Sequence, residues 1–198
     1  MERNSGAAVK DVVILGGPNG AGKTTLAQVL LPKKLAITEF VNADEIARGL
    51  SPFNPEGAAF AAGRVMIGRM RDLVLRGESF AVETTCAGRS HIELLRRCKA
   101  DGWRVTLLFL WLRTPAMAID RVARRVRSGG HNIPAEIIVR RYWNGLRNMR
   151  QFYLPLADSA SIHDNSDGAW SMVAERAEGS SLLVHDAARW KMIEDAAR

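Results

Sequence analysis

A glycine-rich stretch, GGPNGAGKTT at residues 16–25, holds the residues with the clearest chemical potential. Residues 17–24 match the pattern G-x-x-x-x-G-K-[ST] at every fixed position. Glycines let a backbone fold into a nest of inward N–H groups, and the lysine then reaches nucleotide phosphates while the hydroxyl holds Mg²⁺. We therefore predict ATP and Mg²⁺ as cofactors, with Thr24 as the metal ligand and a nucleotide site made of Gly17, Pro18, Asn19, Gly20, Ala21, Gly22, Lys23, Thr24 and Thr25.

The flanks of this stretch favour a phosphate-binding loop over a flexible linker. Residues 12–15 are an apolar run that is typical of a buried strand, and it ends in two glycines. Residues 26–30 place apolar side chains at helical spacing until Pro32. A strand, a loop and the positive end of a helix dipole form an anion site. A dinucleotide fingerprint read from Gly20 fails, because position 25 is a threonine.

Composition limits the class of protein and of partner. The chain has 198 residues, which fits one domain, and 47% of them are hydrophobic, which is enough for a core. The 28 Lys and Arg against 21 Asp and Glu give a net charge of +7, which favours an anionic partner. No apolar run reaches membrane-spanning length, and residues 1–10 lack a signal core. The two cysteines predict no disulfide framework, so we expect a cytoplasmic protein.

Apolar runs alternate with helical patterns along the chain. Strand-like runs at 12–15, 35–41, 80–82, 105–112 and 161–162 alternate with helical patterns at 23–31, 56–76, 90–101, 116–127 and 135–152. The alternation predicts an α/β fold: a parallel sheet of about five strands with helices on both faces and ligands at the carboxyl ends of the strands. We expect a flexible segment at 1–10, a core at 11–168 with a lid at about 116–150, and a C-terminal β-hairpin and helix at 169–198.

Polar residues follow the second strand-like run, where Asn42-Ala43-Asp44 would face the phosphate loop. Phosphoryl transfer to a hydroxyl benefits from a carboxylate that accepts the hydroxyl proton, and Asp44 is our candidate for this base. Two other interpretations stay open: Asp44 as the N-cap of a helix that starts at Glu45, and Asp44 as an indirect Mg²⁺ ligand.

Glu83-Thr84-Thr85 follows the third strand-like run. The carboxylate of Glu83 would bind a substrate hydroxyl or the water shell of the metal, and the two threonines would donate hydrogen bonds to the acceptor molecule. The alternative is a strand end that caps a helix at Ser90. The residues alone do not separate these two interpretations.

Two arginine-bearing helices are joined by a glycine-containing turn, RSGGHNIP at 127–134. In the first helix, Arg121, Arg124 and Arg125 lie opposite an apolar face. The second helix would bury Ile138, Tyr142, Leu146 and Met149 and expose Arg140. A solvated basic face is one explanation. The other is a lid that closes over the nucleotide phosphates and supplies charge to the transferring phosphoryl group.

Taken together, these motifs resemble the zeta-toxin family of P-loop kinases. The resemblance runs from about Asp11 to Ser166 and rests on the ordered set GGPNGAGKTT, FVNADEIA, SFAVETT, RVARRVRSGGHNIP and RRYWNGLRN. It implies a P-loop kinase core and transfer of the ATP γ-phosphate to the 3′-hydroxyl of the sugar in UDP-N-acetylglucosamine. Its best-known members are toxins held by an antitoxin. The chain departs from the long members in its shorter length and in Cys86 and Ala87, where an apolar residue and a serine are familiar.

The resemblance also implies roles for individual residues. Lys23 and Thr24 would bind ATP and Mg²⁺, and Asp44 would activate the sugar hydroxyl. Arg121, Arg127 and Arg141 are close enough in sequence to compete for the part of a lid arginine. The predicted catalytic residues are Asp44, Lys23, Arg125 and Arg140, and the predicted substrate-binding residues are Asn42, Glu83, Thr84 and Thr85.

The sequence thus predicts an ATP-dependent kinase of zeta-toxin type, with UDP-N-acetylglucosamine as the leading acceptor. The expected partners are ATP, a small-molecule acceptor and an antitoxin protein, and no membrane. Three alternatives stay open: a nucleic-acid end kinase or repair ATPase, a non-catalytic nucleotide-dependent toxin–antitoxin partner, and a kinase for another nucleotide or dinucleotide. Nucleic acid is the less favoured partner because the tryptophans do not interleave with the basic residues.

Overall fold

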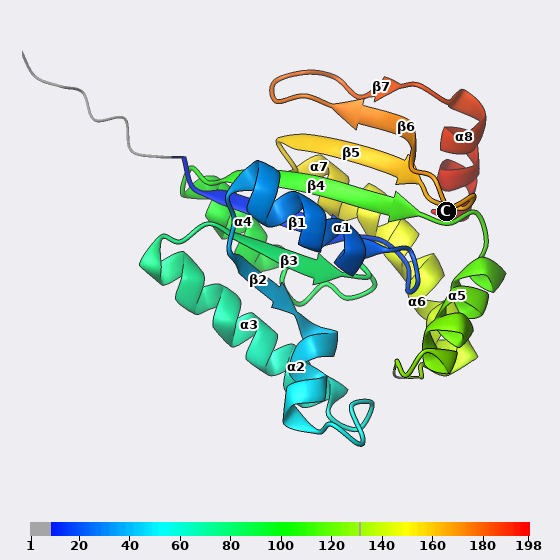
Figure 1. Ribbon diagram of the computed structural model, residues 1–198. Coiled ribbons are helices and arrows are strands. Elements are labelled where there is room, and N and C mark those ends of the chain that lie inside the picture. The colour runs from blue at the N-terminus through cyan, green and yellow to red at the C-terminus, as the bar shows by residue number, and fades with distance from the viewer. Residues whose placement is uncertain (1–8, 131) are drawn as a thin grey trace, which may run out of the picture.

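The computed structural model describes residues 9–130 and 132–198, so part of the N-terminal segment predicted to be flexible lies outside the described residues. Its centre is a seven-stranded sheet in the order β2-β3-β1-β4-β5-β6-β7, with helices in front of it and behind it (Figure 1). The strands are β1 (Asp11–Gly16), β2 (Glu39–Asn42), β3 (Phe80–Thr84), β4 (Arg104–Trp111), β5 (Ser159–Asp164), β6 (Ser171–Arg176) and β7 (Leu183–Val184).

The strands β2, β3, β1, β4 and β5 are parallel, and β6 and β7 continue the sheet in the antiparallel sense. The α/β fold with a largely parallel sheet is therefore confirmed. Glu178, Gly179 and Ser180 lie in the connection between β6 and β7, as the hairpin pattern predicted. The hairpin adds to the hydrogen-bonded sheet through β5 instead of packing beside it.

The helical elements alternate with the strands of the parallel part. A helix in a β-α-β unit covers one face of the sheet, so the parallel strands are buried from both sides. The α-helices are α1 (Lys23–Leu30), α2 (Ala43–Leu50), α3 (Ala59–Arg76), α4 (Ile92–Ala100), α5 (Pro115–Arg127), α6 (Ala135–Asn148), α7 (Leu154–Leu156) and α8 (Ala187–Ala196). Two short π-helical segments are η1 (Leu31–Leu35) and η2 (Met149–Tyr153). None of the described helices is long and apolar enough to cross a membrane.

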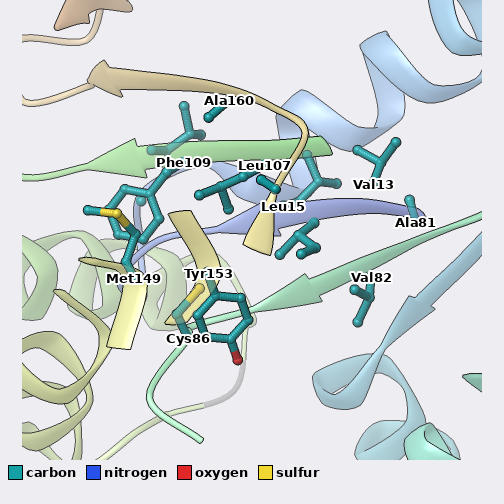
Figure 2. Close-up of a cluster of buried hydrophobic side chains, with 14 of the residues drawn as sticks. Val13, Leu15, Ala81, Val82, Cys86, Leu107, Phe109, Met149, Tyr153 and Ala160 are labelled. Atoms are coloured by element: carbon teal, nitrogen blue, oxygen red, sulfur yellow. The ribbon is translucent and has the colours of Figure 1, made fainter. Parts of the chain in front are cut away.

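The core lies on the parallel strands and on the helix faces that cover them. Val12, Val13, Ile14 and Leu15 are buried, which explains the continuous apolar run of β1. Figure 2 shows Leu107 and Phe109 of β4 among these strands, with Met149 and Tyr153 of η2 packed below. The four α6–η2 residues expected on the buried face, Ile138, Tyr142, Leu146 and Met149, are all buried.

Several boundaries differ from the sequence prediction. The strand expected at 35–41 begins only at Glu39, because residues 31–35 form a π-helical turn. An additional helix, α2, follows β2 without a connecting loop, since the Asn42 side chain caps it. The single helix expected at 135–152 divides into α6 and η2 at Asn148. This division places Asn148 and Tyr153 next to the loop that follows β3, which matters for the site described below.

Candidate active site

The phosphate-binding loop joins β1 to α1 and is built on glycine conformations. Gly17, Gly20 and Gly22 have φ angles of 140°, 75° and 90°, and residues with a Cβ rarely adopt such angles. A Cβ on Gly17 would lie 2.2 Å from the Leu110 carbonyl oxygen of β4. The loop therefore rests directly on the neighbouring strand. At its end, α1 begins at Lys23 and presents the unpaired first-turn N–H groups of a helix.

Lys23 and Glu83 meet at the centre of the site. The lysine side chain is 7% exposed, and its Nζ donates a 3.0 Å hydrogen bond to the Pro18 carbonyl and lies 3.7 Å from Glu83 Oε1. The Thr24 hydroxyl donates to Glu83 Oε2 at 2.8 Å. The Pro18 carbonyl and the Glu83 carboxylate hold the buried Lys23 ammonium beside the loop. The phosphates of a nucleotide would lie at this point.

The residues at this point fit a nucleotide-bound Mg²⁺. Mg²⁺ is commonly held by one or two protein oxygens together with phosphate oxygens and waters. The Thr24 hydroxyl and the Glu83 carboxylate supply two such oxygens, 2.8 Å apart, at the edge of the glycine loop. No group of three or more His, Cys, Asp or Glu side chains among the described residues could form a separate all-protein metal site. The donor set thus suits a metal that arrives with its nucleotide.

Asn42 orders the base of the crevice. Its Nδ2 donates to Glu83 Oε2 at 3.0 Å, and its Oδ1 accepts from the backbone N–H groups of Asp44 and Glu45 at 2.9 and 3.4 Å. One amide therefore caps α2 and fixes the Glu83 carboxylate. These contacts are all with the protein, so the substrate contact expected of Asn42 stays a prediction.

Asp44 lies in the first turn of α2 and is half-buried. Asn42, and not Asp44, is the N-cap. Within the described part of the chain, the Asp44 carboxylate has no hydrogen bond or ion pair. The residue lines each of three cavities: one with Lys23 and Thr24, one with Thr84 and Thr85, and one with Arg140 and Arg141. Asp44 is thus a carboxylate between the phosphate loop and the space for a second molecule.

The predicted lid arginines are separated by the structure. Arg125 lines the cavity of the phosphate loop, whereas Arg140 lines the cavity between α2, α3 and α6. Arg121 lines the phosphate cavity and donates to the carbonyls of Gly20 at 3.4 Å and Ser166 at 3.0 Å. Arg121 thereby connects α5 to the phosphate loop and to the end of β5. Arg140 lines a different cavity because the opposite face of α6 packs into the core.

A second cavity, of about 280 Å³, lies between Asp44 and the loop that follows β3. Thr84 Oγ1 accepts from the Cys86 N–H at 3.0 Å, and Thr85 Oγ1 accepts from the Ala87 N–H at 3.4 Å. Each threonine acts as an acceptor in these bonds, so its hydroxyl proton is directed to another partner. For Thr84 that partner is the Tyr153 hydroxyl, and Thr85 has its proton for a molecule in the cavity. This cavity has the features expected of an acceptor site.

The two departures from the zeta-toxin pattern have different environments. Cys86 is fully buried, with its Sγ 2.9 Å from where a Cβ on Gly16 would lie, and burial raises the pKa of its thiol to about 12. The thiol is therefore neutral and packed under the phosphate loop. Ala87 lines the second cavity. Only the change at position 87 reaches the space for an acceptor.

Three polar residues around the second cavity did not enter the sequence prediction. Asn148, Tyr153 and His91 are buried, and all three contact the loop after β3 or follow it directly. Asn148 stands beside the apolar stripe of α6, and an amide among Leu146 and Met149 was the available signal. No sequence motif near Tyr153 or His91 indicated a contact between them, because they are 62 positions apart in the chain.

With the site described, comparison with known proteins gives the family. The family model AAA_33, described as an AAA domain, matches residues 12–142. The chain belongs to this AAA-domain family. An uncharacterised protein of Haemophilus influenzae is 32% identical over 126 residues, which are 64% of this chain and 88% of that protein.

Solved structures with the same fold include a chain of a two-protein complex and a chain of a toxin–antitoxin system. A chain of the AvrRxo1-ORF1:AvrRxo1-ORF2 complex with sulphate ions matches with a TM-score of 0.72 and 19% identity over 95% of this chain. This chain spans 64% of the length of that protein, which is also known in a complex with ATP. A chain of the PezAT toxin–antitoxin system of Streptococcus pneumoniae matches with a TM-score of 0.66 and 16% identity, covering 98% of this chain and 88% of that one. A putative kinase from Chloroflexus aurantiacus matches with a TM-score of 0.52 and 13% identity over 68% of this chain and 76% of that one. The AAA_33 member described here therefore has a P-loop kinase-like fold.

Proposed function

We propose that this AAA_33 member is an ATP-dependent phosphotransferase that phosphorylates a hydroxyl group of a small molecule. The observation that carries the proposal is the position of Asp44. Its carboxylate lines both the cavity of the phosphate loop and the cavity of Thr84 and Thr85. A base for a hydroxyl nucleophile must lie between donor and acceptor sites, and it must not be consumed by a salt bridge. Asp44 meets both requirements among the described residues.

In the proposed reaction, the loop amides and Lys23 hold the triphosphate, and Arg121 and Arg125 face the same cavity. Mg²⁺, held by Thr24 and Glu83, would neutralise the charge that develops on the phosphates. Asp44 accepts the hydroxyl proton as the acceptor oxygen bonds to the γ-phosphorus and the bond to the ADP oxygen breaks. Thr84 and Thr85 line the acceptor cavity, where the Thr85 hydroxyl proton would orient the acceptor. Each oriented donor at the phosphoryl group typically contributes about 3 kcal/mol to lowering the barrier.

UDP-N-acetylglucosamine is the first acceptor that we propose to test. The support is the resemblance of the ordered motifs to the zeta-toxin kinases, together with a fold shared with a chain of a toxin–antitoxin system. Arg140 and Arg141 line the cavity beyond Asp44, where they suit an acceptor that carries phosphate. The same fold similarity motivates a search for an antitoxin partner.

The test is turnover of γ-labelled ATP over a panel of sugar nucleotides, nucleotides, dinucleotides and oligonucleotides. We expect Asp44→Asn to lower kcat by about 10²- to 10⁴-fold, because the amide cannot accept the proton, while the Kd for ATP stays within about twofold. Lys23→Ala should remove ATP binding. Glu93→Gln is the matched control, because this exposed carboxylate of α4 pairs with Arg96 and lines none of the three cavities, so its loss should leave kcat unchanged.

Two results would contradict the proposal. One is an Asp44→Asn variant that phosphorylates its acceptor at the wild-type rate. The other is label transferred only to oligonucleotide ends, with binding that weakens steeply as salt rises, which would identify a nucleic-acid kinase.

A further inference from the structure

The loop after β3 is held from behind by the segment that joins α6 to η2. We call residues 84–91 the acceptor wall, because Thr84, Thr85 and His91 line the second cavity. The Nδ2 of Asn148 donates to the carbonyls of Cys86 at 2.9 Å and Ala87 at 3.0 Å. The Tyr153 hydroxyl donates to the carbonyl of Gly88 at 2.9 Å. Three consecutive carbonyls of the wall are therefore directed at two buried side chains.

These contacts also fix the other side of each peptide. In a trans peptide the N–H points away from the C=O, so a carbonyl held by Asn148 or Tyr153 turns the next N–H in the opposite direction. The Ala87 and Gly88 carbonyls thus direct the N–H groups of Gly88 and Arg89 away from α6 and η2. Figure 2 shows Tyr153 beside Cys86. The face of the wall opposite Tyr153 is therefore left with these two N–H groups.

His91 fixes the orientation of the Tyr153 hydroxyl. Its Nε2 lies 2.8 Å from the phenol oxygen, which also donates to Gly88. A phenol has one proton and a carbonyl can only accept, so Nε2 is the donor in the second bond. The imidazole is neutral, since burial lowers its pKa to about 4. The His91–Tyr153–Gly88 chain consequently has one consistent set of donors.

Close packing adds a steric constraint on the same loop. A Cβ on Gly145 of α6 would lie 2.4 Å from the Thr85 carbonyl oxygen, so only glycine allows this approach. Cys86 has a φ of 59°, a left-handed conformation that is unfavourable for a residue with a side chain. Such a conformation persists where surrounding contacts determine it. The contacts here are those of Gly145, Asn148 and Tyr153.

We propose that Asn148 and Tyr153 are positioning residues of the acceptor site, and that they act by holding the acceptor wall in its binding conformation. The inference rests on the proposed function for the identity of the site, and on the hydrogen bonds to Cys86, Ala87 and Gly88 for the linkage itself. All of these contacts go to backbone carbonyls. The wall can therefore keep its shape when the side chain at 87, which lines the cavity, changes, whereas the side chain at 86 is constrained by its own burial.

The test compares Tyr153→Phe and Asn148→Ala with Tyr142→Phe. Tyr142 is a matched control on α6, because its buried hydroxyl donates a 2.7 Å hydrogen bond to the Leu112 carbonyl, outside the acceptor wall. We expect amide hydrogen exchange in peptides covering 84–91 to become roughly 3- to 10-fold faster in the first two variants and to stay unchanged in the third. The Kd for ATP should stay within about twofold in all three.

Turnover supplies the second readout. With the acceptor identified by the panel, KM for that acceptor should rise by roughly the same factor in Tyr153→Phe, while kcat changes less and KM for ATP stays unchanged. Unchanged exchange at 84–91, or equal acceleration in Tyr142→Phe, would overturn the linkage. Faster exchange with an unchanged acceptor KM would overturn the positioning role. If the panel yields no acceptor, the proposed function fails, and the exchange result still decides whether these side chains hold the wall.

Discussion

The loop that faces the nucleotide comes from ten consecutive residues, whereas the acceptor wall is held by side chains 62 and 65 positions away in the chain. The phosphate loop, which is the nucleotide half of the site, takes its shape from the backbone conformations of its own glycines. The acceptor half takes its shape from α6 and η2, which are separate elements. A change in α6 can therefore alter the acceptor site without touching the phosphate loop, which is one way for a kinase fold to change substrate.

Two glycine substitutions give the largest expected effects and separate the halves. Gly17→Ala places a Cβ 2.2 Å from the Leu110 oxygen at a φ of 140°, and Gly145→Ala places one 2.4 Å from the Thr85 oxygen. We expect the first to lower the free energy of unfolding by about 3 kcal/mol or more and the second by about 1–3 kcal/mol. Below their melting temperatures, Gly17→Ala should weaken ATP binding, and Gly145→Ala should leave it near the wild-type Kd.

Urea denaturation measures the first quantity, and calorimetric titration with ATP measures the second. Equal losses of ATP affinity in both variants would mean that the two halves are one cooperative unit, and the comparison drawn above would be wrong.

His91 gives the acceptor half a dependence on mild acid. Its pKa is lowered to about 4 by burial, while the unfolded chain binds the proton near pH 6.5, so the unfolded state gains from protonation first. The free energy of unfolding should therefore fall as the pH drops from about 6.5 to about 4, by up to about 1.4 kcal/mol per pH unit from this group.

His91→Gln is the variant that isolates this effect, because the glutamine amide can still donate to Tyr153 and does not titrate. Urea denaturation at several pH values between 4 and 7 gives two curves, and their difference reports His91 alone. Parallel curves for wild type and variant would show that His91 is not held neutral in the folded protein.

The smallest expected effect comes from a glycine with open space around the position that a Cβ would occupy. Gly68 lies inside α3, and a Cβ there would meet nothing within 4 Å. Gly68→Ala should raise the free energy of unfolding by about 0.5–1 kcal/mol, because alanine loses less backbone entropy in a helix. Thermal unfolding checks this, and a loss of stability would show that the steric argument used for Gly17 and Gly145 is unsafe.

The sequence was sufficient for the nucleotide half because its information is local. Residues 16–25 carry their own turn chemistry, and the apolar runs on either side set the strand and the helix. The parallel fold and the buried face of α6 followed from periodicity in the same way. Asp44 and Glu83 could be predicted to share one crevice because strand ends in such sheets face it, and their roles in the site stay predictions.

The remaining features of the site depend on contacts between segments that are distant in the chain. The periodicity of apolar residues gives no information about such contacts. The start of α2 was missed: the open alternative began a helix at Glu45 with Asp44 as its cap, whereas the Asn42 side chain caps the helix and it begins at Ala43. Arg125 and Arg140 were assigned to the phosphates from the resemblance, and the structure places them in different cavities, because helix rotation decides which arginines face the loop. Tyr153 and His91 become a pair only when η2 folds against the acceptor wall.

The sheet has its longest strand, β4, in the interior and its shortest strands at the two margins. The outermost strands, β2 and β7, have four and two residues. Unpaired backbone groups on a long outer strand recruit other chains into shared sheets, and short outer strands limit this templating. Because the hairpin hydrogen-bonds to β5, it shields the six-residue β5 from that hazard. The C-terminal hairpin thus contributes to colloidal behaviour at high protein concentration as well as to the fold.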